Sequence, residues 1–187
     1  KFIDESIDLV KKILDISQGK ALILFTSKAD MNAVYTRLKA LNLNYTLIKQ
    51  NEISSQQQLI HKFKQDVNSV LLGTGVFWEG ISIEGIALSN LIIYKLPFSL
   101  PEPIINEKCK RSKNPLEEVL VPEMIIKLKQ GVGRLIRNKT DKGIVSIIDS
   151  RLGDKSKASY KEKVWQALPI KQRTNSLKEL QSFYDNL

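Results

Sequence analysis

The feature that most constrains the fold is an alternation of short apolar runs with segments of helical spacing. Five runs are predicted as strands, at residues 21–25, 45–48, 70–72, 91–94 and 143–148. The first is apolar throughout, as expected of a strand buried on both faces. Strands that alternate with helices predict a parallel sheet covered by helices on both sides. We therefore expect an α/β fold.

The intervening segments define the predicted helices. They cover residues 1–18, a segment from Ser27 or Asp30 to 41, residues 54–65, and residues 104–137 with breaks at Asn114-Pro115 and Pro122. Residues 156–187 are predicted as two polar helices separated near Pro169. A length of 187 residues suits one domain. We assign residues 1–18 to an entry helix, 19–170 to the domain and 171–187 to a helical tail.

Composition limits the classes of site. A single cysteine, Cys109, leaves no internal disulfide and no zinc or iron–sulfur site made by this chain alone. The single histidine, His61, lies in a helical run and is expected at the surface or at a cap. No apolar run approaches the roughly 18–20 residues that cross a bilayer, so we expect a cytoplasmic protein with no membrane contact. Because the chain starts at Lys1 rather than Met, we interpret it as part of a longer polypeptide.

The formal charge of +9 indicates a possible polyanionic partner, because neutralising phosphates releases counterions. The surplus lies mainly in the second half, in clusters at residues 108–113, 127–142 and 155–173. A lysine-rich, solvated surface produced by coding bias explains the same charge. Charge alone does not separate these interpretations, and residues 108–113 fit either a DNA-contacting loop or a solvated one.

The segment from Gln130 to Arg137, QGVGRLIR, is the sharpest candidate for chemistry. On a helix, Gln130, Arg134 and Arg137 share one face. Gly131 and Gly133 each disfavour a helix by about 1 kcal/mol relative to Ala, which suggests close approach of another backbone or a ligand. Two planar cationic donors on one face suit phosphate oxygens. The alternative is an exposed helix with two solvated arginines.

A glycine-rich segment, LLGTGVFWEGISIEG at residues 71–85, follows a predicted strand. Its amides and hydroxyls are suited to approach a ligand, although such loops also serve as plain connectors. Phe77 and Trp78 are expected in the core rather than as base-stacking platforms. In parallel sheets, ligands sit beyond the carboxyl ends of the strands. That rule selects residues 26–27, 73–75, 95–98 and 149–151.

Two features of nucleotide-binding domains are missing from the sequence. No segment fits the phosphate-binding pattern GxxxxGK[ST], and no acidic cluster follows a strand in the manner of a magnesium-binding pair. A nucleotide site made with this chain therefore needs another segment to supply its phosphate loop and its metal ligands.

Taken together, these segments resemble the C-terminal RecA-like motor domain of superfamily 2 helicases, in the DinG and XPD branch. LILFTSK at residues 22–28 resembles motif IV, residues 71–85 resemble motif V with the FWEG core typical of DinG, and residues 130–137 resemble motif VI. KLPFSLPEP at 95–103 resembles a DinG loop, and IDSR at 148–151 resembles the strand end behind motif VI. The resemblance spans residues 19–165, and several motifs in register are more specific than any one.

The resemblance implies a RecA-like parallel sheet and a division of labour. A partner N-terminal motor domain of the same polypeptide would hold ATP and Mg²⁺, so this chain alone is expected to be inactive. Arg137 would be an arginine finger, with Arg134 and Gln130 assisting. The residues implied in nucleotide binding or in coupling it to DNA are Glu79, Gly80, Ser82 and Gly133. The residues implied in contacts with phosphates of single-stranded DNA are Thr26, Ser27 and Thr74.

One position departs from the family pattern. The family usually has Asp where this chain has Ser82, so we expect weaker ATP hydrolysis than in a typical relative. Some DinG relatives carry a 3′–5′ exonuclease domain ahead of the motor, and the Lys- and Asn-rich composition suits such a source. The rival interpretation is therefore a DNA-holding module with weak or regulatory ATPase activity. A free-standing nucleotide-binding domain has no phosphate loop to support it.

Overall fold

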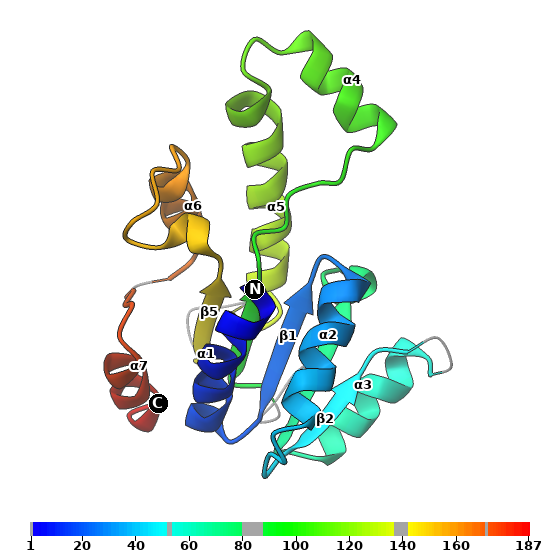
Figure 1. The fold of residues 1–187 in the computed structure, drawn as a ribbon, viewed down its shortest axis with the longest axis vertical. Coiled ribbons are helices and arrows are strands. Elements are labelled where there is room, and N and C mark those ends of the chain that lie inside the picture. Colours follow the sequence, from blue (N-terminus) through cyan, green and yellow to red (C-terminus); the bar gives the residue numbers. More distant parts are fainter. Residues whose placement is uncertain (1, 52–53, 80–87, 137–141, 171) are drawn as a thin grey trace.

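The fold is built on a five-stranded sheet in which every paired strand is parallel (Figure 1). The computed structural model describes residues 2–51, 54–79, 88–136, 142–170 and 172–187. The strand order is β2-β3-β1-β4-β5. The strands are β1 (Ala21–Phe25), β2 (Thr46–Lys49), β3 (Ser69–Thr74), β4 (Asn90–Tyr94) and β5 (Ile144–Ile148). The predicted α/β class and all five predicted strands are confirmed.

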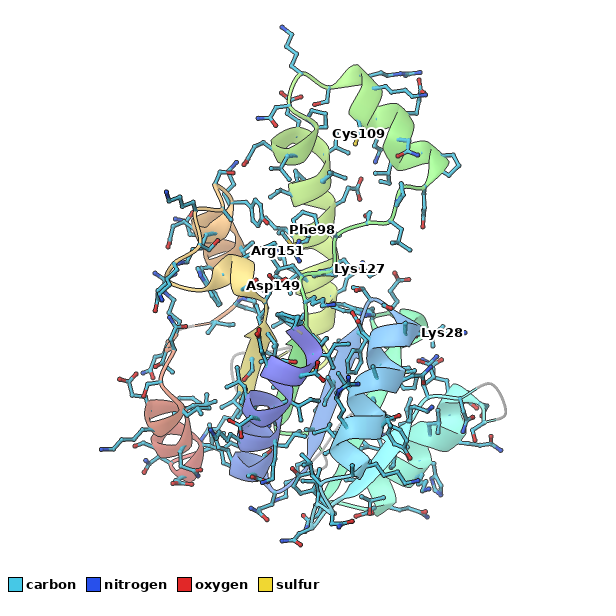
Figure 2. All side chains as sticks on the ribbon, viewed as in Figure 1. Lys28, Phe98, Cys109, Lys127, Asp149 and Arg151 are labelled. Carbon is cyan, nitrogen blue, oxygen red and sulfur yellow. The ribbon has the colours of Figure 1, made fainter. Side chains whose placement is uncertain are left out.

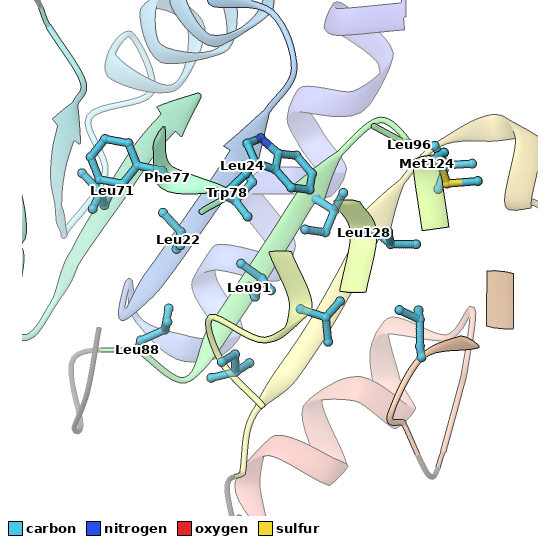
Figure 3. Close-up of a cluster of buried hydrophobic side chains, with 14 of the residues drawn as sticks. Leu22, Leu24, Leu71, Phe77, Trp78, Leu88, Leu91, Leu96, Met124 and Leu128 are labelled. Carbon is cyan, nitrogen blue, oxygen red and sulfur yellow. The ribbon is translucent and has the colours of Figure 1, made fainter. Parts of the chain in front are cut away.

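Helices cover both faces of the sheet because the side chains of the central strand alternate between two apolar clusters. Leu22 and Leu24 of β1 pack with the side chains of α3 (Gln56–Gln65), α5 (Val121–Val132) and α6 (Lys161–Ala167). Figure 3 shows part of this cluster, with Leu22 and Leu24 of β1, Leu91 of β4 and Leu128 of α5 labelled. Ile23 and its neighbours Ala21 and Phe25 pack instead with α1 (Phe2–Ser17) and α2 (Lys28–Lys39).

The C-terminal helix α7 (Leu177–Asp185) lies on the α1 side of the sheet. Leu177 and Leu180 pack against the cluster that α1 helps to form. The hydroxyl groups of Tyr184 and Ser89 are 2.6 Å apart in a hydrogen bond that joins the helix to the start of β4. The tail therefore packs onto the sheet domain.

A helical projection leaves the sheet after β4 and extends well beyond its edge (Figure 1). We call residues 97–120 the arm; it contains α4 (Pro103–Arg111) and a π-helical turn (Leu116–Leu120) that leads directly into α5. The predicted interruption at Pro122 coincides with a change of helix type: the π-helical turn ends at Leu120, and α5 begins at Val121 with Pro122 in its first turn. Because Pro has no backbone N–H, it cannot continue the hydrogen bonding of the turn before it.

The helix that follows the arm ends earlier than predicted. α5 stops at Val132 with Gly133 as its C-cap, so Arg134 lies in a turn rather than on the helix. The Arg134 amide donates to the Gly131 carbonyl at 3.0 Å, a three-residue spacing that tightens the last turn. The two glycines that weaken this segment explain the early end.

Three predictions about single residues are confirmed. His61 is exposed on α3, and Phe77 and Trp78 are buried in the core. Across the described ranges, no helix combines the length and the apolar character that a bilayer span requires.

Candidate functional site

The carboxyl ends of four strands meet at one edge of the sheet. Phe25, the last residue of β1, is in register with Thr74 of β3 and Tyr94 of β4, and Tyr94 is in register with Ile148 of β5. The segments that follow these strands are therefore neighbours, as the strand-end rule predicted. We call this edge, with the first turn of α2, the carboxyl edge.

The first turn of α2 offers a site for an anion at this edge. Thr26 is exposed, and the Ser27 hydroxyl accepts a hydrogen bond from the Asp30 amide at 3.3 Å, which caps the helix. Helix N-termini carry partial positive charge and favour phosphate groups. Lys28, the exposed first residue of α2, adds a cation at the same place (Figure 2).

Thr74 is engaged by a residue that the motif analysis missed. The Thr74 amide and hydroxyl donate to Gln50 Oε1 at 2.7 and 3.2 Å, and the threonine is only 6% exposed. A phosphate reaches the Thr74 hydroxyl only if the Gln50 side chain moves aside. Gln50 directly follows β2, so the strand-end rule applied to that strand is the signal that could have found it.

Lys95 joins the end of β4 to α2. Its Nζ lies 2.6 Å from Asp30 Oδ2, with both side chains half-buried. Lys95 adopts a φ of +69°, a left-handed conformation that non-glycine residues rarely take. The ion pair holds the first turn of α2 beside the segment that leads to the arm.

A second ion pair fixes the root of the arm (Figure 2). Asp149 accepts two hydrogen bonds from the Arg151 guanidinium, at 2.9 and 2.6 Å, and one from the Leu96 amide at 2.7 Å. The guanidinium carbon lies 4.8 Å from the centre of the Phe98 ring. Burial raises the pKa of Asp149. The hydrogen bonds from the Arg151 guanidinium and from the backbone amides of Leu96 and Arg151 outweigh this effect and hold the pKa below its ordinary value.

Gln130 and Arg134 of motif VI do not share one helical face as predicted, because Arg134 lies beyond the end of α5. Gln130 is exposed in the last turn of α5, and the partly exposed Arg134 in the following turn donates from Nε to the Gln130 carbonyl at 3.3 Å. Gly133 is the helix cap, and a Cβ there would lie 3.3 Å from carbonyl oxygens of its own helix. Gln130 and Arg134 are therefore still neighbours, joined by a hydrogen bond across the turn that follows α5. Arg137 lies outside the described residues.

Gly131 is closely approached by another part of the chain, as its poor helix propensity suggested. A Cβ at this position would lie 2.7 Å from the Trp78 ring, so the close neighbour is a side chain. Of the remaining motif V candidates, Glu79 is exposed directly after Trp78. Gly80 and Ser82 lie outside the described residues.

Comparison with known sequences places this arrangement in a family. The family described as the helicase C-terminal domain matches residues 10–171. The chain is 37% identical over 186 residues to the ATP-dependent DNA helicase YoaA of Haemophilus influenzae, covering 96% of this chain and 28% of that protein. It is 34% identical over 189 residues to the 3′-5′ exonuclease DinG of Bacillus subtilis, covering 96% of this chain and 19% of that protein. The chain thus spans less than a third of the length of these relatives.

Solved structures support the same fold. A structure of apo XPD superimposes with a TM-score of 0.67 at 22% identity, over 89% of this chain and 35% of that one. The C-terminal domain of S. cerevisiae Dbp5 superimposes with a TM-score of 0.57 at 15% identity, over 98% of this chain and 92% of that one. The family match over residues 10–171 and the sequence relatives show that the chain belongs to the helicase C-terminal domain family, as the C-terminal domain of a DinG-type helicase.

Proposed function

We propose that this chain is the second motor domain of an ATP-dependent DNA helicase or translocase. In this proposal, an N-terminal motor domain of the same polypeptide holds ATP, and the present domain supplies cationic groups to the nucleotide and phosphate contacts to single-stranded DNA. The names of the relatives and their greater length support this division.

The observation that carries the DNA half of the proposal is the first turn of α2. Exposed Thr26, the helix N-terminus capped by Ser27, and exposed Lys28 lie together at the carboxyl edge. Such groups bind phosphates and do not read base edges, which suits a motor that moves along any sequence. Thr74 joins this contact if Gln50 moves away from its hydroxyl.

The nucleotide half rests on the end of α5. Guanidinium groups fit the equatorial oxygens of a transferring phosphoryl group, and arginine fingers in other proteins accelerate hydrolysis by about 10³–10⁵-fold. We assign the finger to Arg137, with Arg134 assisting it and Gln130 anchoring Arg134 through its carbonyl. We assign Glu79, Gly80 and Gly133 to nucleotide binding or to the coupling of nucleotide binding to DNA.

Magnesium is assigned to the partner domain. Among the described residues, no group of three or more His, Cys, Asp or Glu side chains is placed to hold a metal ion. When bound on the partner domain, Mg²⁺ would neutralise phosphate charge during transfer. The residues of this chain fit the complementary task of donating hydrogen bonds to the phosphates.

Ser82 is expected to weaken this machinery. A hydroxyl can donate a hydrogen bond to a ribose or accept one from an arginine, but it lacks the charge of the Asp that the family usually carries. We predict that Ser82→Asp raises the ATP affinity or the turnover of the full-length parent protein. Unchanged affinity and turnover in that variant contradict the prediction.

The first test is DNA-stimulated ATP hydrolysis by the full-length parent protein. Single-stranded DNA is expected to stimulate hydrolysis, and Arg137→Ala is expected to abolish most of that rate, by about 10³-fold or more. Arg173→Ala is a matched control, because Arg173 contacts Glu162 and Trp165 of α6, outside the candidate site. Equal rates for the Arg137 and Arg173 variants refute the finger assignment.

A second candidate function is a DNA-holding scaffold with weak or regulatory ATPase activity in an exonuclease. Ser82 and the similarity to an exonuclease DinG favour it. A full-length parent protein that binds single-stranded DNA tightly but shows no ATP hydrolysis above background supports the scaffold and rejects the motor.

A further inference from the structure

Trp78 contacts the direct chain neighbours of two groups of candidate site residues: Phe25, which precedes Thr26 and Ser27, and Gly131, which follows Gln130. It lies in the apolar cluster of Figure 3 with Leu24 and Leu128, and its relative exposure is 0%. Its indole Nε1–H donates a hydrogen bond of 2.8 Å to the Phe25 carbonyl at the end of β1. Its six-membered ring faces Gly131 in α5, where an added Cβ would lie 2.7 Å from the ring.

On the DNA side, the hydrogen bond orients the peptide that leads to the phosphate contacts. The Phe25 carbonyl and the Thr26 amide belong to one planar peptide group. Trp78 therefore sets the direction in which the chain leaves β1. Ser27 holds the other end of this short segment, since its carbonyl accepts from the Met31 amide at 3.1 Å and its hydroxyl caps α2.

On the nucleotide side, the ring sets how closely the end of α5 approaches the sheet. Gly131 directly follows Gln130, and its carbonyl accepts the Arg134 amide at 3.0 Å. One turn earlier, Lys127 Nζ lies 5.7 Å from the centre of the indole ring. Because interiors are packed without spare volume, a shift of this helix end displaces the indole.

We infer that Trp78 is a positioning residue that transmits movement between the phosphate-binding end of α5 and the DNA-binding turn of α2. The inference rests on the proposed function and adds the route of coupling to it. A movement of α5 toward nucleotide pushes the indole, and the indole hydrogen bond carries that movement to the Phe25–Thr26 peptide. Glu79, the residue after Trp78, is displaced with it.

The test is the dependence of ATP hydrolysis by the full-length parent on single-stranded DNA concentration. Trp78→Phe keeps an aromatic ring and removes the N–H donor. We expect the DNA concentration for half-maximal stimulation to rise about threefold to tenfold, the range for one lost hydrogen bond. Phe77→Leu is the matched control, because Phe77 is also buried and lies against Gly73 of β3. It should lower the melting temperature without changing the DNA dependence.

Gly131→Ala alters the contact between α5 and the Trp78 ring from the α5 side and leaves the indole N–H intact. It should raise the half-maximal DNA concentration as Trp78→Phe does, and it decides the question if Trp78→Phe does not fold. Variants of Trp78 and Gly131 that behave like Phe77→Leu overturn the inference while the motor stands. A parent protein without DNA-stimulated hydrolysis overturns the proposed function and the inference together.

Discussion

Asp149 shows how one carboxylate organises the boundary between the sheet and the arm. Its side chain is only 4% exposed, so its charge needs internal partners. Arg151 and the Leu96 amide supply them, and Arg151 in turn stacks on Phe98. The residue therefore joins the end of β5 to the segment from which the arm departs.

Replacing this carboxylate should destabilise the domain in a pH-dependent way. Asp149→Asn places an amide group where a carboxylate oxygen accepts hydrogen bonds, and we expect a loss of about 1–3 kcal/mol of unfolding free energy at pH 7. Because folding lowers the pKa of Asp149, its contribution is complete above the ordinary value of about 3.9 and is lost as the pH falls through the folded pKa. Urea unfolding from pH 7 to pH 3 measures this.

The matched control is Asp8→Asn, since Asp8 is 71% exposed and pairs only with Lys12 one helical turn away among its described contacts. Its effect should stay within about 0.5 kcal/mol. A difference between wild type and Asp149→Asn that is as large at pH 3 as at pH 7 contradicts the prediction.

At the scale of elements, three of the described helices begin at a serine cap. Ser27, Ser55 and Ser176 each accept a hydrogen bond from an amide in the first turn of α2, α3 and α7 respectively. At α2 alone among these three, the proposed function gives the capped end a second role, which is to bind a phosphate of single-stranded DNA. The two roles can be separated by substitution.

Ser27→Asp should keep the fold and weaken DNA binding. Aspartate caps helices about as well as serine does, so the unfolding free energy should change by less than about 1 kcal/mol. The added negative charge should lower the affinity of the full-length parent for single-stranded DNA about fivefold to tenfold. Fluorescence anisotropy with a labelled oligonucleotide measures that affinity. Ser176→Asp makes the same change at α7, and equal losses in both variants would remove Ser27 from the DNA contact.

For the whole molecule, the net charge of +9 hides an uneven distribution. The cluster at residues 108–113 sits on the arm, whose residues 97–120 hold four basic and four acidic side chains. Lys108 pairs with Glu123 at 2.6 Å, and Arg111 pairs with Glu107 at 3.0 Å. These pairs favour the solvated interpretation of the cluster over a DNA-contacting one.

The salt dependence of DNA binding should reflect this distribution. In the full-length parent, Lys28→Ala should reduce the slope of log affinity against log salt by about 0.7, the value for one phosphate contact on a single strand. The double variant Lys110→Ala/Arg111→Ala should leave the slope unchanged. A reduced slope in the double variant identifies the arm as a DNA contact after all.

Local patterns in the sequence determined the element order, the parallel sheet and the family. Apolar periodicity and strand-end motifs depend on residues close together in the chain, so they can be recognised without a structure. They identified the carboxyl edge and the phosphate-binding candidates Thr26, Ser27 and Arg134. Helix ends were less well predicted, because the stop of α5 at Val132 depends on two glycines and a tightened turn.

Only the tertiary structure decided which side chains meet across the sheet. The Trp78 indole donates a hydrogen bond to a carbonyl 53 residues earlier in the chain. Gln50 accepts one from the amide of Thr74, which lies 24 residues later. Gly131 was singled out by its poor helix propensity, but its partner was unknown until the Trp78 ring was seen against it. Such contacts depend on how helices and strands pack in three dimensions, and no local period or spacing encodes them.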